Sequence, residues 1–146
     1  MEKFSYQIAA GNSTGTKLFI TGSSSAGSVI TELTVGCDGA GAASLNFKLR
    51  RIQTRSVGFF GNGNSYGDMD LAKSYWVIPF SEPTYYDGNL LSGSVASHTT
   101  FRWSASKEEG LVLPRSGDEG IGYVQSSLGS RNDPSARWRV NIVWTQ

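Results

Sequence analysis

The segment WRVNIVWT, residues 138–145, places an apolar side chain at every second position. Successive side chains of a β-strand point to opposite faces, so this alternation predicts a strand with one apolar face. That face belongs in a hydrophobic core, and the opposite face, with Arg137 and Arg139, is expected to be solvated or to contact a partner. The four residues of the apolar face are Trp138, Val140, Ile142 and Trp144.

Residues 45–52 show the same period of two, with Leu45, Phe47, Leu49 and Arg51 on one face. The other face carries Asn46, Lys48, Arg50 and Ile52, which indicates a half-buried strand. Seven shorter segments between Gly, Pro, Asn, Asp or Ser residues are also predicted strands, at 4–9, 16–21, 29–35, 75–80, 99–103, 111–113 and 121–126. About nine strands without helices predict an all-β fold, an antiparallel β-sandwich or barrel, and eight-stranded jelly rolls fit this number.

Length and composition agree with this fold class. A chain of 146 residues suffices for one domain, so we expect residues 1–146 to form a single β-sandwich domain. Glycine contributes 18 residues, above the average of about 7%, as expected for short strands joined by tight turns. No segment is predicted to be a linker between domains.

The charge pattern argues against nucleic acid or a membrane as a partner. The formal net charge is +1, which provides no long-range attraction for polyanions. Lys48, Arg50, Arg51 and Arg55 form a basic group, but alternation sends Arg50 and Arg51 to opposite faces, and a second group lies at residues 131–139. The N-terminal sequence lacks the apolar run of a signal peptide, so we expect synthesis in a cytoplasm.

Catalytic, metal and cofactor sites are not expected. His98 is the only histidine and stands in no nucleophile motif, so it is interpreted as a strand-end residue. Cys37 has no second cysteine to pair with, and a buried or half-buried thiol is favoured over a reactive one. Asp68 and Asp70 are interpreted as turn carboxylates, and the acids at 108–109 and 118–119 as exposed turn residues rather than a glycosidase pair.

Aromatic residues near turns are the candidate contacts. The irregular segment 56–73 contains Phe59 and Phe60 between glycines, the first candidates for a subunit or capsid contact. Tyr85 and Tyr86, between Pro83 and Asp87, are the second pair. For each pair the alternative is a local lid over the core. A sugar-binding role for Tyr85, Tyr86 and the tryptophans at 76 and 103 is a further alternative to burial in the core.

Three segments, at residues 13–23, 110–122 and 138–146, are together similar to the small jelly-roll virion proteins of tailed bacteriophages, including capsid decoration or cement proteins. The resemblance concerns strands and turns, and residues 59–69 are not part of the pattern. It implies a structural protein on the outer capsid surface of a virion, bound to the major capsid protein, as a homotrimer and without catalytic residues. A glycan- or receptor-binding module of a phage tail or fibre is the alternative.

Overall fold

A computed structural model of the chain describes residues 3–10, 14–21, 27–37, 44–53, 75–77, 84–86, 88–96, 99–113, 119–128 and 138–145. Secondary structure in these residues consists of strands, without a helix. The eleven strands are β1 (Lys3–Ala10), β2 (Gly15–Thr21), β3 (Ser28–Cys37), β4 (Ser44–Gln53), β5 (Tyr75–Val77), β6 (Thr84–Tyr85), β7 (Leu91–Ala96), β8 (Thr100–Ser104), β9 (Leu111–Leu113), β10 (Glu119–Leu128) and β11 (Trp138–Thr145). The predicted all-β class is confirmed.

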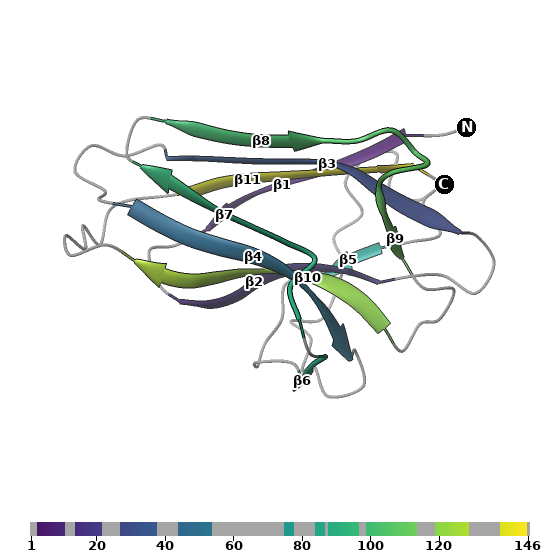
Figure 1. Cartoon of the computed structure of the whole chain (residues 1–146), viewed down its shortest axis with the longest axis horizontal. Coiled ribbons are helices and arrows are strands. Elements are labelled where there is room, and N and C mark those ends of the chain that lie inside the picture. Colours follow the sequence, from purple (N-terminus) through teal and green to yellow (C-terminus); the bar gives the residue numbers. More distant parts are fainter. Residues whose placement is uncertain are drawn as a thin grey trace.

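The strands form two antiparallel sheets that face each other as two layers (Figure 1). Sheet A has the order β1-β11-β3-β8, and β9 also pairs with β3; sheet B has the order β5-β2-β10-β4-β6, and β7 also pairs with β4. Eight strands have five or more residues, and in sequence order the first of them pairs with the last, the second with the seventh, the third with the sixth and the fourth with the fifth. This nested antiparallel pairing is that of a jelly roll, so the predicted sandwich is confirmed.

Two edge strands are each divided into two pieces by a turn. β8 and β9 both pair with β3, and between them the amide of Ala105 donates to the carbonyl of Thr31 over 2.9 Å. β6 and β7 both pair with β4, and the chain between them passes Gly88, whose φ of 86° favours glycine. Strands β6 and β7 were not predicted, because their sequences lack the bulky alternation that identified the others.

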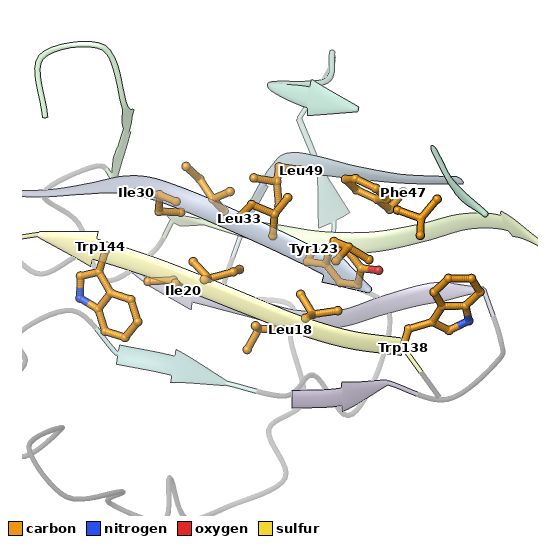
Figure 2. Packing of buried hydrophobic residues seen from close by; sticks show 14 of the residues in the cluster. Leu18, Ile20, Ile30, Leu33, Phe47, Leu49, Tyr123, Trp138 and Trp144 are labelled. Carbon is orange, nitrogen blue, oxygen red and sulfur yellow. The ribbon is translucent and has the colours of Figure 1, made fainter. Parts of the chain in front are cut away.

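The core lies between the sheets and includes the predicted apolar face of β11. Trp138, Val140, Ile142 and Trp144 are completely buried. In Figure 2 the two tryptophans lie at opposite ends of the cluster, with other core side chains between them. Because each large aromatic side chain removes roughly 150–250 Å² from water, these two contribute heavily to burial. The other members are Leu18, Ile20, Ile30, Leu33, Val35, Leu45, Phe47, Leu49, Val95, Leu113, Ile121 and Tyr123.

A β-bulge in sheet A explains why Ile30 and Leu33, which are three residues apart, both lie in the core. Val143 pairs with Glu32 but Trp144 pairs with Ile30, so Thr31 is the extra residue. The bulge reverses the facing of the residues before it, so Ile30 enters the same core as Leu33. On the opposite face of β11, Arg139 is exposed as expected, whereas Val143 is buried.

Glycine at position 93 is required by close packing of aromatic rings. Gly93 of β7 pairs with Phe47 of β4, whose ring packs edge-on against that of Phe101 from sheet A at 4.9 Å between centroids. A Cβ atom at Gly93 would lie 2.7 Å from Cζ of Phe47 and 3.0 Å from Cε2 of Phe101. Any side chain at this position must therefore displace both rings, which link the two sheets.

We expect Gly93→Val to lower the free energy of unfolding by about 1–3 kcal/mol, because overpacking forces the rings from their positions. Urea denaturation followed by tryptophan fluorescence measures the loss. Ser92→Val, at the neighbouring exposed position, is the matched control and should remain near the parent value. Equal stability of the two variants would contradict the packing argument.

Burial controls the ionisation of Tyr123. Its side chain is completely buried, and its hydroxyl donates to Oε1 of the buried Gln125 over 3.2 Å. Loss of solvation raises the pKa of the Tyr123 phenol far above its ordinary value of about 10. The folded protein therefore keeps this proton at pH values where the unfolded chain releases it.

The unfolded state is consequently favoured as the pH rises past about 10, by about 1.4 kcal/mol per pH unit for this one group, whereas below that pH there is no such penalty. We expect Tyr123→Phe, which has no phenol to ionise, to show a shallower decline of the free energy of unfolding above pH 10. Urea midpoints between pH 8 and 11 provide the comparison. Parallel declines would show that Tyr123 ionises freely in the fold.

Candidate interaction surface

Tyr85 lies against the outer face of sheet B, the face turned away from sheet A. It pairs with Ile52 of β4, in a segment that Figure 1 shows on the far side of sheet B from sheet A. Its hydroxyl forms a hydrogen bond with Oγ1 of Thr16 in β2. The guanidinium carbon of Arg50 lies 4.3 Å from the centre of the Tyr85 ring. Since β10 lies between β4 and β2, the tyrosine side chain spans three strands of the sheet.

Gly122 of β10 makes this arrangement possible. A Cβ atom there would lie 3.3 Å from Cγ2 of Ile52 and 3.5 Å from Cγ2 of Thr16. The absence of a side chain lets residues of the two neighbouring strands approach each other over β10. Ile52 is completely buried although it points away from the inter-sheet core. The outer face of β4 is thus covered at Ile52, whereas the neighbouring Arg51 is exposed.

Tyr86 is joined to the same surface by three hydrogen bonds. Nη2 of Arg50 donates to its carbonyl oxygen over 3.1 Å, and its own amide donates to the carbonyl of Arg51 over 3.0 Å. Its hydroxyl donates to Oε1 of Glu119 over 2.9 Å. Glu119, which sequence reasoning placed in an exposed turn, is instead a half-buried residue of β10 that holds the loop to the sheet.

Arg50 is the cation at the centre of the group formed with Tyr85, Tyr86, Thr16 and Ile52, which is called the sheet B cluster below. No carboxylate in the described part of the chain forms an ion pair with it, and its buried Nε has no hydrogen-bond partner there. The aromatic face of Tyr85 and the carbonyl of Tyr86 both stabilise the guanidinium. Arg51, the next residue, is exposed, so the predicted separation of these two arginines to opposite faces is confirmed.

Tyr85 and Tyr86 thus form a cover over the outer face of sheet B rather than over the core between the sheets. Both are half-buried, and each retains exposed surface. Their role as a subunit or capsid contact stays a prediction. The first-ranked pair, Phe59 and Phe60, lies outside the described residues.

The outer face of sheet A has a different character. One row across the sheet consists of Gln7, Asn141, Thr34 and Arg102, which are consecutive register partners on four strands. Nε of Arg102 lies 3.1 Å from Oε1 of Glu32 in a mainly exposed ion pair, which contributes little to stability. This row is polar, but the same face of sheet A also carries the buried Val143 and the exposed Val112. Among the described residues it has no covering cluster like that on sheet B.

The residues considered for catalysis or metal binding are not brought together where they are described. Glu108 and Glu109 are exposed residues of the turn between β8 and β9, as predicted. His98, Asp68, Asp70 and Asp118 lie outside the described residues, as does the side chain of Cys37. Within the described ranges, no three His, Cys, Asp or Glu side chains are grouped so as to hold a metal ion.

Of the two tryptophans considered for sugar binding, the structure describes the side chain of one. Trp103 is half-buried, pairs with Leu33 and packs against the core cluster, as expected for most aromatics of a sandwich. Trp76 belongs to β5, and its side chain lies outside the described residues. Sequence reasoning named both tyrosines of the sheet B cluster but missed Thr16, Gly122 and Ile52, since only pairing across β10 brings these together.

Comparisons with known proteins found no matching family model, no matching curated protein and no matching solved structure. The assignment to the jelly-roll architecture therefore depends on the strand order itself. A helix long and apolar enough to span a membrane is not found in the described part of the chain.

We expect the hydrogen bond between Tyr85 and Thr16 to stabilise the fold by about 0.5–1.5 kcal/mol, since it closes the cluster across β10. Tyr85→Phe, Thr16→Val and the double variant form a double-mutant cycle in urea denaturation, which isolates the pair from the other contacts of each residue. Both replacements preserve side-chain shape. Strictly additive losses would mean that the bond contributes nothing.

Proposed function

We propose that this chain is a structural virion protein, a capsid decoration (cement) protein that binds the outside of a phage head and stabilises it. The observation that supports the proposal is the nested strand pairing of the two sheets, an architecture used by viral capsid and lectin domains. The resemblance of residues 13–23, 110–122 and 138–146 to jelly-roll virion proteins points in the same direction.

The physical character of the surfaces is compatible with this role. A decoration protein requires a rigid body and a polar surface that rests on a repeating lattice. The core of large buried side chains supplies rigidity, and the row Gln7, Asn141, Thr34 and Arg102 supplies hydrogen-bonding groups on sheet A. Many equivalent contacts on a shell raise the apparent affinity without a single strong site.

The proposed partner is the major capsid protein, and the proposed assembly is a homotrimer on the outer capsid surface. A trimer would cover sandwich edges that a monomer leaves exposed. Phe59 and Phe60, and after them Tyr85 and Tyr86, are the proposed contact residues. For the tyrosines the support is their exposed surface on the sheet B cluster.

A glycan- or receptor-binding module of a tail or fibre is the alternative, because lectin domains share this architecture. The two functions differ in what the isolated protein binds. A receptor module shows saturable binding to immobilised glycans, whereas a cement protein binds empty heads and raises the temperature at which they rupture.

Electron cryomicroscopy of particles that co-purify with the chain tests the proposal. We expect its density at regularly repeated positions on the outside of the shell, in groups related by threefold axes. Heads stripped of the protein should rupture at a lower temperature and recover when it is added back. Density confined to a tail tip, together with glycan binding, would replace the proposal with the alternative.

A further inference from the structure

The four edges of the sandwich are not equivalent. In sheet B, β5 has three residues, and the opposite edge is divided into β6 and β7. In sheet A, one edge is divided into β8 and β9 by a turn that carries the exposed Lys107, Glu108 and Glu109. Short strands, interruptions and charges are the usual means by which proteins prevent edge strands from pairing with other chains.

β1 lacks these protections. It runs for eight residues, and all eight pair with β11 in an unbroken register from Lys3↔Thr145 to Ala10↔Trp138. It contains neither proline nor an internal charge, since Lys3 stands at its beginning. In the described part of the chain, β1 pairs on one side only, and no main-chain hydrogen bond to a turn or loop involves it.

Among the described residues, the side of β1 away from β11 therefore carries a regular row of unpaired main-chain donors and acceptors. In an antiparallel ladder every second residue directs its N–H and C=O groups away from its partner. Water satisfies these groups in a monomer, but such a row is also a template with which another extended strand can pair along its length. From this comparison of edges we propose that β1 pairs antiparallel with β1 of a second copy of this chain, about a twofold axis.

The sequence of β1 is compatible with pairing to itself. Residues opposite each other on paired strands point to the same side of a sheet. A twofold axis normal to the sheet therefore passes midway between the two copies of one residue, which face each other. With the axis at Tyr6, Ser5 faces Gln7 of the second copy and Lys3 faces Ala9. The exposed side chains of Lys3, Ser5 and Gln7 then meet without opposing like charges.

This contact joins two copies of sheet A edge to edge and closes on itself, because a twofold contact uses the same strand of both copies. The free main-chain groups of both edges are thereby paired. The inference goes beyond the proposed function and does not rest on it. A twofold contact between protomers can exist with or without threefold contacts and with or without a capsid.

Charge at Ser5 and Gln7, two of the exposed positions of β1, tests the pairing. Ser5→Lys/Gln7→Lys places lysines opposite lysines for an axis at either Tyr6 or Gln7, and we expect association to weaken about tenfold at low salt. Ser5→Glu/Gln7→Glu should weaken it similarly. An equimolar mixture of the two variants should restore the parent association, since the lysine at position 7 then faces a glutamate for either axis.

Sedimentation equilibrium over a range of protein concentrations measures the association, and urea denaturation verifies that each variant is folded. Ser92→Lys/Ser94→Lys, with the same spacing at exposed positions of the edge strand β7, is the matched control and should associate like the parent. Association restored in the mixture, with this control unaffected, establishes pairing through β1. A parent protein that stays monomeric overturns the inference. A trimer whose association is insensitive to charge at residues 5 and 7 also overturns it, but that second result would leave the proposed function intact.

Discussion

The pairing of β11 on both of its sides is the constraint on which the rest of the sandwich depends. β11 lies between β1 and β3, so the main chain of the C-terminal segment is hydrogen-bonded across the middle of sheet A. Its position brings Trp138 and Trp144 to the two ends of the core, and both are completely buried. Unpaired main-chain groups in such an apolar interior would be costly, so the ladder and the core require each other.

The two outer faces show how one architecture produces surfaces of opposite kinds. On sheet B, Gly122 leaves β10 without a side chain, and Ile52, Tyr85 and Arg50 close over it. On sheet A the side chains of Gln7, Thr34 and Arg102 follow the pleat and remain accessible to different degrees. A partner would meet a covered, aromatic surface on sheet B and a row of polar side chains on sheet A.

The four edges of the sandwich also differ from one another. β1 is a long regular strand, whereas the other three edges are short or divided. A structural protein of an assembly requires contacts between copies or with a lattice, and it does not require a catalytic site. The lack of an internal charge in β1 and the polar row Gln7, Asn141, Thr34 and Arg102 on sheet A are both properties of surfaces rather than of a pocket. Both features can be changed by substitution, so both allow the proposed structural role to be tested.

The sequence by itself determined the class of fold and part of the core, namely the apolar faces of β11 and β4. Alternation in residues 138–145 and 45–49 identified buried positions correctly, because a strand with one apolar face has only one stable way to orient it. The turn residues around Tyr85 and Tyr86 also identified this pair as candidate contact residues. Only the tertiary structure decided that the segment LSGSVA at 91–96 is a strand, since its pairing with β4 outweighs the weak strand preference of serine and glycine. The same holds for the bulge at Thr31 and for the contact of Thr16 with Tyr85, which joins residues 69 positions apart. Period-two alternation is local and can be found in one segment, whereas register, bulges and coverage of an outer face arise from pairing between segments that the sequence does not place side by side.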